Sequence, residues 1–169
     1  MLKIKILENV YLNKNLAIKP DYLIHPTVSG NKFRKLKYNL EKAQSTNVNG
    51  LLTFGGAYSN HIAATAAAGK ELNMPTVGVI RGEELETHVE NNPTLKYARD
   101  CGMHLEFVER SIYKNKTDPV YLQFLELVNL ACICSSLVNR MSPKEFLPKR
   151  PMGLILVELK SPLSALFIW

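Results

Sequence analysis

Cysteine is scarce in this chain of 169 residues, and its three copies are Cys101, Cys132 and Cys134. An odd number at these spacings fits neither a paired zinc motif nor the disulfide framework of a small secreted domain. A reducing compartment is the simpler expectation. We therefore expect a cytoplasmic protein without a metal site.

Long hydrophobic runs are also missing. The apolar stretch 127–134 is well short of the ~20 residues that a membrane-spanning helix needs. The first seven residues, Met1 to Leu7, alternate in polarity and are too short and too charged for a signal peptide. The sequence contains no internal repeat or low-complexity tract, and we expect no membrane partner.

Acidic residues are outnumbered, with 15 against 21 lysines and arginines, giving a formal net charge of +6. A basic surface can bind nucleic acid or can simply be solvated. The basic residues gather at Arg34, Lys35 and Lys37, on the polar side of a predicted helix, and in the last 30 residues or so. No known nucleic-acid-reading motif accompanies them, so we predict a solvated face and no nucleic-acid partner.

The remaining composition is that of an ordinary globular protein, with 46% hydrophobic and 21% charged residues. Apolar runs at 16–19, 50–54, 76–80 and 104–108 predict strands. Amphipathic or capped segments predict the helices between them, the first starting at Phe33, just after Lys32. This alternation predicts an α/β fold with a three-layer arrangement, a parallel sheet between flanking helices.

The regular pattern ends near residue 128, after a further helix predicted at 121–128. Prolines at 143, 148 and 151 interrupt the sequence that follows, and we predict no strand there. We therefore expect two parts, an α/β region at 1–128 and an anomalous tail at 129–169.

Two segments carry candidate chemistry. Ser29-Gly30-Asn31-Lys32 precedes one predicted helix, and Gly55-Gly56-Ala57-Tyr58-Ser59-Asn60-His61 leads into another. A lysine can condense with an aldehyde cofactor, and a helix N-terminus offers unpaired N–H groups to anionic oxygens. The same residues also fit an ordinary surface lysine and an ordinary helix cap.

Together with four further motifs, these segments resemble the family of 1-aminocyclopropane-1-carboxylate deaminases and D-cysteine desulfhydrases, which use pyridoxal phosphate. The resemblance extends from about Leu16 to Pro119. The further motifs are Asp21-Tyr22-Leu23-Ile24-His25-Pro26, Val79-Ile80-Arg81-Gly82-Glu83-Glu84-Leu85, Asn92-Pro93-Thr94-Leu95 and Cys101-Gly102-Met103. The family fold is tryptophan synthase beta-like, and the resemblance implies that its small domain is largely present and most of its large domain is missing.

The resemblance also implies roles for individual residues. Lys32 matches the catalytic lysine that binds pyridoxal phosphate and moves protons, with Asn31 beside it at the cofactor. Asn60 matches the asparagine that hydrogen-bonds the cofactor's ring oxygen. Ser59 matches a catalytic hydroxyl beside the substrate, a role compatible with capping a helix.

Three more positions are assigned to the cofactor with open alternatives. Gly55 and Gly56 would let the backbone approach it, although a glycine pair after a strand also forms a plain turn. His61 would stack near the ring or donate a hydrogen bond, or it is a satisfied, partly buried histidine. His25 is interpreted as structural.

Two departures from the family pattern affect the expected activity. Lys19-Pro20-Asp21-Tyr22 stands where the family usually has lysine-arginine-aspartate-aspartate, and the glycine-rich phosphate loop expected beyond residue 121 is not found. We expect a truncated relative with impaired activity, its tail read in another frame or spliced differently.

The substrate expected from the resemblance is a small amino acid, and His61 after Asn60 slightly favours D-cysteine. The alternative is a non-catalytic relative that acts through association, and a homodimer is possible under either reading.

Overall fold

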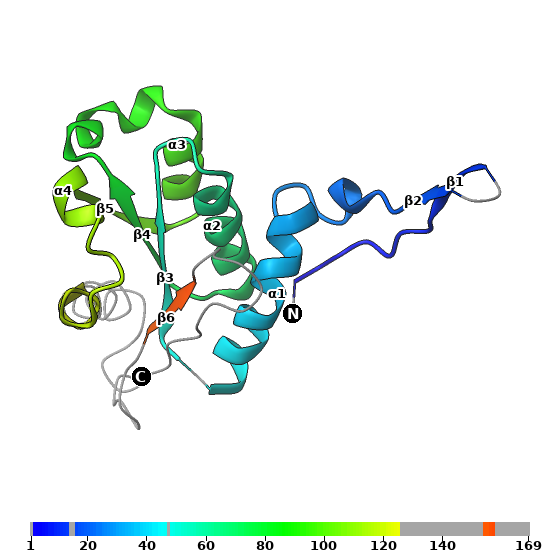
Figure 1. The fold of residues 1–169 in the computed structure, drawn as a ribbon, viewed down its shortest axis with the longest axis horizontal. Helices are drawn as coiled ribbons and strands as arrows, with labels where there is room; N and C mark the ends of the chain where they lie inside the picture. Colours follow the sequence, from blue (N-terminus) through cyan, green and yellow to red (C-terminus); the bar gives the residue numbers. More distant parts are fainter. Residues whose placement is uncertain (1, 14–15, 47, 126–153, 158–169) are drawn as a thin grey trace.

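A four-stranded parallel sheet forms the centre of the molecule. The computed structural model describes residues 2–13, 16–46, 48–125 and 154–157. The sheet contains β3 (Gly50–Gly55), β4 (Thr76–Arg81), β5 (Met103–Val108) and β6 (Leu154–Val157) in the order β5-β4-β3-β6 (Figure 1). The α/β class predicted from the alternating pattern is confirmed.

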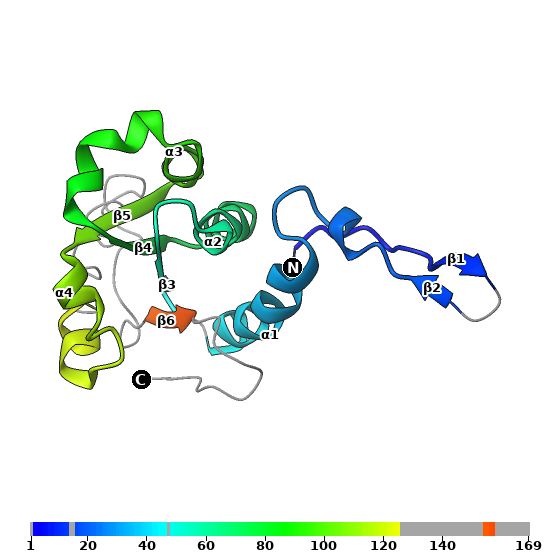
Figure 2. The same ribbon diagram turned by 45° about the horizontal axis from the view of Figure 1, so that its top comes forward.

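Helices lie on both faces of this sheet. On one face are α2 (Asn60–Leu72) and α3 (Pro93–Asp100), and α1 (Gly30–Thr46) packs beside α2 (Figures 1 and 2). On the other face, residues of the helical segment 119–125 pack with Tyr113, at the end of α4 (Arg110–Tyr113). The expected three layers are therefore present.

Strand β3 shows how the sequence produces these layers. Because side chains alternate along a strand, Leu51 and Thr53 face α1 and α2, whereas Leu52 and Phe54 face the layer that contains Tyr113. Every residue of β3 is buried. A short apolar run without polar alternation is typical of a parallel strand covered on both faces.

The strand predicted at 16–19 lies outside the parallel sheet, so including it in the alternating pattern was wrong. β2 (Leu16–Ile18) pairs antiparallel with β1 (Val10–Asn13), which was not predicted, in a hairpin that projects from the body (Figures 1 and 2). Because β1 and β2 are adjacent in sequence, pairing them costs little loop-closure entropy. The 3-10 helix η1 (Asp21–Leu23) then leads back towards the body.

Two further differences concern the helices. α1 begins at Gly30, so Lys32 lies inside its first turn and not before it. The 3-10 helix η2 (Glu83–Asn91) was not predicted.

The tail contains a strand where none was predicted, since β6 pairs in parallel with β3 from Gly50 opposite Leu154. The predicted helix at 121–128 is helical up to 125, and its remainder lies outside the described residues, as does the proposed boundary at 128. None of the described helices has the length and apolar character needed to cross a membrane.

Candidate functional site

The start of α2 follows directly from the carboxyl end of β3. The chain turns through Gly56, whose carbonyl accepts a 3.0 Å hydrogen bond from the Ser59 amide. Ser59 caps the helix, and its hydroxyl accepts a 3.3 Å hydrogen bond from the amide of His61. The predicted cap is thus present, and it holds Asn60 at the first position of the helix.

The two glycines before this cap meet different surroundings. A β-carbon on Gly55 would lie 2.4 Å from Cγ1 of Ile62 and 3.1 Å from Cβ of Ser59, so the first turn of α2 already fills that space. A β-carbon on Gly56 would have no atom within 4 Å. Gly55 is therefore required by helix packing, whereas Gly56 borders open space.

The side chains of Asn60 and His61 point into different environments. Asn60 is exposed, and within the described residues its amide makes no hydrogen bond. His61 is only 6% exposed, and its Nε2 lies 2.7 Å from the Thr53 hydroxyl on β3. This geometry favours the structural reading of His61, and its role at a cofactor stays a prediction.

Lys32 and Asn31 lie in the first turn of α1. The Lys32 amide donates a 3.1 Å hydrogen bond to the carbonyl of Ser29, and its side chain is half-buried. Within the described part of the chain, its amine makes no ion pair or hydrogen bond. Asn31 is exposed.

The two helix starts belong to neighbouring helices. Leu36 and Leu40 of α1 pack with Ala64 and Ala68 of α2 in one buried cluster. The two helices run in broadly the same direction, from the top of the view downwards, in Figure 1. The first turns that carry Lys32, Ser59 and Asn60 therefore face towards the same end of the molecule, without a hydrogen bond from Lys32 to either of the other two.

The loop before α1 contains a polar arrangement around His25, the residue interpreted from the sequence as structural. Nδ1 of His25 accepts hydrogen bonds from the amides of Thr27, at 3.1 Å, and Val28, at 2.9 Å. Its Nε2 lies 2.9 Å from a carboxylate oxygen of Glu71, near the end of α2. The sequence offered only one signal, a histidine placed seven residues before Lys32.

Glu71 also accepts a hydrogen bond from the backbone amide of Lys3. This amide, and then His25, lower the pKa of the Glu71 carboxyl below its ordinary value. The carboxylate therefore ties the amino-terminal segment and the loop before α1 to the same helix.

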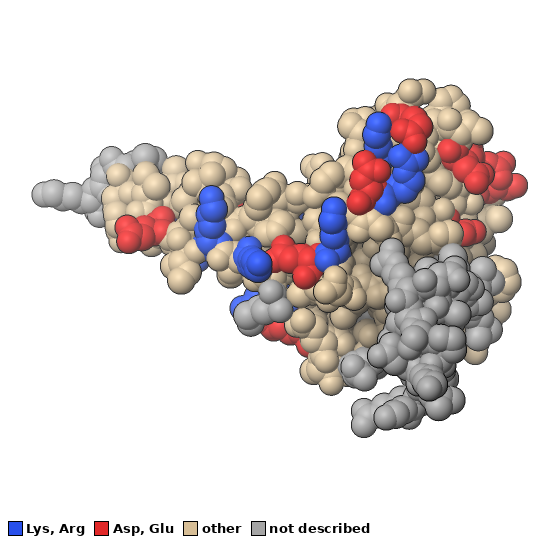
Figure 3. Space-filling model, turned by 180° about the vertical axis from the view of Figure 1, so that it is seen from behind, with Lys and Arg blue, Asp and Glu red and all other residues tan. Residues whose placement is uncertain are grey.

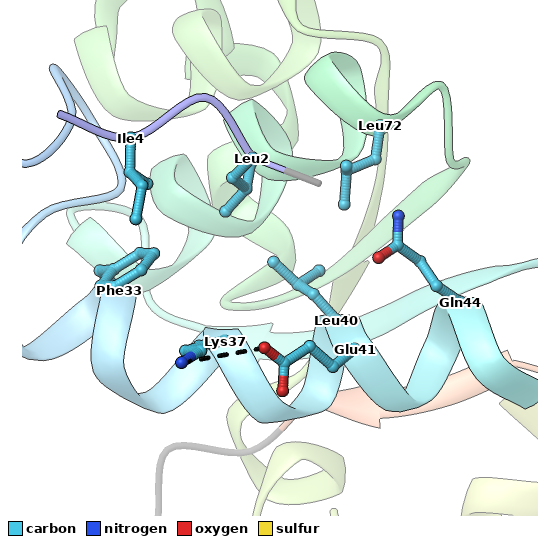
Figure 4. A pocket seen from close by; sticks show the side chains of 8 residues that line it. All are labelled: Leu2, Ile4, Phe33, Lys37, Leu40, Glu41, Gln44 and Leu72. Atoms are coloured by element: carbon cyan, nitrogen blue, oxygen red, sulfur yellow. Dashed lines mark ion pairs between the residues drawn. The ribbon is translucent and has the colours of Figure 1, made fainter. Parts of the chain in front are cut away.

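Two cavities lie near these helices. A small apolar one, about 60 Å³, lies between the amino-terminal segment and α1, with Leu2, Phe33, Leu40 and Leu72 among its lining residues (Figure 4). It contains none of the predicted site residues. A cavity of about 260 Å³ is lined by Tyr58, the residue before Ser59, and by residues of η2 and α3.

Two basic residues of α1 form ion pairs with acidic ones. Arg34 lies 2.5 Å from Asp21, and Lys37 lies 3.9 Å from Glu41. Lysines and arginines alternate with acidic side chains over the face drawn in Figure 3. Among the described residues, no group of three histidine, cysteine or acidic side chains could hold a metal ion.

No family model matches this chain. The known proteins that are similar to it in sequence are named as deaminases or desulfhydrases. A Pyrococcus abyssi protein provisionally named 1-aminocyclopropane-1-carboxylate deaminase is 38% identical over 74 residues, 44% of this chain and 22% of that protein. The Arabidopsis thaliana mitochondrial bifunctional D-cysteine desulfhydrase/1-aminocyclopropane-1-carboxylate deaminase is 37% identical over 70 residues, 41% of this chain and 18% of that protein. D-cysteine desulfhydrase of Salmonella paratyphi B is 31% identical over 88 residues, 50% of this chain and 27% of that protein.

A crystal structure of a homologue of 1-aminocyclopropane-1-carboxylate deaminase is 31% identical, with a TM-score of 0.45, over 54% of this chain and 27% of that chain. The predicted resemblance is confirmed by the curated relatives, since the chain is similar in sequence to these deaminases and desulfhydrases. The matched part of the chain spans 18% to 27% of the length of the three curated relatives.

Proposed function

We propose that this chain is a cytoplasmic, pyridoxal-phosphate-dependent deaminase or lyase that acts on a small amino acid. The reaction would be of the D-cysteine desulfhydrase or 1-aminocyclopropane-1-carboxylate deaminase type. One observation carries the proposal: a lysine and a serine-asparagine pair occupy the first turns of two neighbouring helices. The named relatives supply the reaction class.

The described residues fit two of the four polar parts of pyridoxal phosphate, which are its aldehyde, ring oxygen, ring nitrogen and phosphate. Lys32 offers an amine, without an ion-pair partner among the described residues, for the aldehyde. The exposed amide of Asn60 and the space beside Gly56 suit the ring oxygen. When bound, the cofactor withdraws electrons from the substrate's α-carbon and so eases loss of a proton there.

Each residue would then have a separate task. Lys32 would hold the cofactor and, as a neutral amine, take the proton from the substrate. Asn60 would orient the ring by donating a hydrogen bond, and Asn31 would support Lys32. Ser59 would combine its cap with a hydrogen bond to the substrate carboxylate, because the helix start favours negative charge.

Binding of the phosphate is the weak part of this site. Only one glycine, Gly153, follows Gly102 in the sequence, so a glycine-rich cradle of backbone amides is lacking there. Such cradles supply much of the affinity for a phosphate group. We therefore propose that the chain binds the cofactor loosely and that its activity is impaired.

Chemical trapping at Lys32 tests the proposal. The chain is incubated with pyridoxal phosphate, reduced with borohydride, and mapped by peptide mass. We expect a label confined to Lys32, lost in Lys32→Ala and kept in the control Lys35→Ala, one turn further along α1. Scattered label, or label that Lys32→Ala leaves unchanged, would overturn the proposal.

Product analysis then separates the two substrate types. D-cysteine would give pyruvate, ammonia and sulfide, whereas 1-aminocyclopropane-1-carboxylate would give 2-oxobutanoate and ammonia. Sulfide release that disappears in Ser59→Ala, with Lys32 still labelled, would place Ser59 at the substrate. Release unaffected by that substitution would leave Ser59 only as a helix cap.

A second candidate is a non-catalytic protein that acts through association. The observation that favours it is the projecting amino-terminal part, where Ile6 is 98% exposed, Tyr11 73% and Tyr22 70%. Large exposed apolar side chains on a projecting segment invite contact with another protein surface. Sedimentation analysis over a range of protein concentrations would detect dimers, and a strict monomer would count against this candidate.

A further inference from the structure

His25 is fixed in one protonation form by its hydrogen bonds. A backbone N–H can only donate, so the amides of Thr27 and Val28 require a lone pair on Nδ1. The ring proton must then be on Nε2, where the carboxylate of Glu71 accepts it at 2.9 Å. The arrangement uses a neutral imidazole with its proton on Nε2.

The ring joins three parts of the chain. Its own loop, 25–29, leads directly into the first turn of α1, where Lys32 donates to the carbonyl of Ser29. Glu71 belongs to α2 and also accepts the backbone amide of Lys3. The side chain of His25 is 11% exposed and that of Glu71 is 22% exposed, so both are partly shielded from solvent.

We propose that His25 is a proton-sensitive positioning residue, whose neutral ring holds the loop that sets the start of α1 and hence the place of Lys32. The proposal rests on the proposed function as far as Lys32 is concerned. We call the contacts of the His25 ring with the amides of Thr27 and Val28 and with Glu71 the clamp. The clamp can be tested without any cofactor.

Protonation of Nδ1 would remove the acceptor and present a third donor to the two amides. One of these amides belongs to Val28, which is fully buried in the cluster between α1 and α2. Releasing its amide therefore disturbs the packing of the loop against both helices. A fall in pH should loosen the residues that precede Lys32.

The charged groups near His25 act in different directions. The carboxylate of Glu71, from α2, attracts a protonated ring, whereas Lys3, from the amino-terminal segment, engages the same carboxylate. Tyr97, from α3, faces the loop through a 3.0 Å hydrogen bond to the hydroxyl of Thr27. Of these, only the Glu71 carboxylate attracts the protonated ring, and the clamp works only if loss of the acceptor outweighs that attraction.

The chain contains a matched control that does not titrate. At the start of α3, Oδ1 of Asn92 accepts hydrogen bonds from the amides two and three residues later, Thr94 and Leu95, both at 3.0 Å. His25 makes the same pattern with Thr27 and Val28. An amide oxygen carries no proton, so the Asn92 bonds should persist where the His25 bonds fail.

Three variants separate the two halves of the clamp. His25→Asn places an amide oxygen near the position of Nδ1 but is too short to make the hydrogen bond to Glu71. His25→Gln keeps a donor that can reach Glu71 and gives up the near acceptor. His25→Ala removes both.

Amide hydrogen exchange of the full chain, without cofactor, is the direct test. Between about pH 8 and about pH 5, the range in which histidines ordinarily titrate, protection at Thr27 and Val28 should fall on the order of tenfold, after correction for intrinsic exchange rates. Protection at Thr94 and Leu95 should stay constant. His25→Gln should show the low protection at every pH, and His25→Asn should keep high protection at every pH.

Three results would overturn the clamp. The first is equal pH dependence at the His25 and Asn92 pairs, and the second is wild-type protection in His25→Gln. Constant or increased protection at low pH would mean that attraction by Glu71 outweighs the lost acceptor, which also rejects the proposal.

Trapping with pyridoxal phosphate then tests the link to Lys32. We expect several-fold less label on Lys32 in His25→Gln than in wild type, and wild-type label in His25→Asn. Unchanged label in His25→Gln, despite lost protection at Val28, would reduce His25 to a structural residue. If wild-type Lys32 takes no label at all, the proposed function fails, while the exchange data still decide the clamp.

Discussion

The starts of α1 and α2 both carry candidate site residues, but different forces hold them in place. At α2, β3 and the helix approach so closely that Gly55 cannot carry a side chain, and His61 is buried against Thr53. At α1, polar contacts of a loop set the start, which begins at Gly30 with a positive φ of 54°. Packing thus fixes Asn60, whereas hydrogen bonds of the loop that contains His25 hold the start that carries Lys32.

Gly55→Ala should have the largest effect on stability, because it disrupts the packing of β3 against the start of α2. Its new β-carbon would meet Ile62, which is fully buried and cannot move aside. We expect a loss of about 3 kcal/mol in the free energy of unfolding, measured by urea denaturation.

Gly56→Ala is the control for this substitution, with open space around the new atom. It should change the free energy of unfolding by less than about 0.5 kcal/mol. Equal losses in the two variants would show that α2 does not press on β3 as described.

Thr53→Val tests the buried polar contact under the same helix start. The substitution keeps the side-chain shape but removes the hydroxyl that lies 2.7 Å from Nε2 of His61. We expect a loss of about 2 kcal/mol, because a buried imidazole loses a hydrogen-bond partner.

Thr65→Val makes the same chemical change on α2, one turn after His61. The Thr65 hydroxyl is buried and has no hydrogen-bond partner among the described residues. Its removal should leave stability unchanged or raise it slightly. A larger loss at Thr65 than at Thr53 would contradict the importance given to the contact with His61.

Gly30→Ala tests the other helix start, where backbone conformation is limiting and space is not. A β-carbon there would have no neighbour within 4 Å, but φ is +54°. We expect a loss of about 1 kcal/mol, and a smaller one for Gly30→Asn, since asparagine tolerates the left-handed region better. Thermal unfolding of both variants checks this order. A larger loss of stability in Gly30→Asn than in Gly30→Ala would contradict it.

Apart from the two control substitutions, Glu71→Gln should have the smallest effect, and that effect should depend on pH in a characteristic way. The Lys3 amide and His25 lower the pKa of Glu71 in the folded state. Its stabilising contribution is therefore present above the ordinary carboxyl pKa and disappears as pH falls through the lowered value. Unfolding measured from about pH 7 to about pH 3 should show wild type and variant converging at the acid end. A gap that widens on acidification would give the opposite sign.

The two regions also differ in how far the sequence predicted them. The β3 strand, the Ser59 cap and the Asn92-Pro93 helix start were predicted because they depend on local rules, namely apolar runs and cap chemistry. The start of α1 was placed too late, since neither the positive φ at Gly30 nor the His25 contact with Glu71 has a local signal. Glu71 lies 46 residues away from His25 in sequence.

Pairing across the sheet was the other unpredictable feature. Strand β2 looked like a member of the parallel sheet because its residues suit any strand, yet it pairs with β1. Strand β6 follows a proline-rich stretch that gave no periodic pattern. The roles proposed for Lys32, Ser59 and Asn60 came from the resemblance.

The position of β6 has a consequence for folding. Strands β3, β4 and β5 follow one another in sequence and in the sheet, so each pair needs only the one crossover that contains α2 or α3. β6 joins β3 from the far end of the chain, with Leu154 opposite Gly50. Until it docks, β3 has an open backbone edge in a strand whose side chains are all apolar, glycine or threonine. Before β6 docks, we expect this edge of β3 to pair with another copy, so dilution should raise the yield of refolded protein.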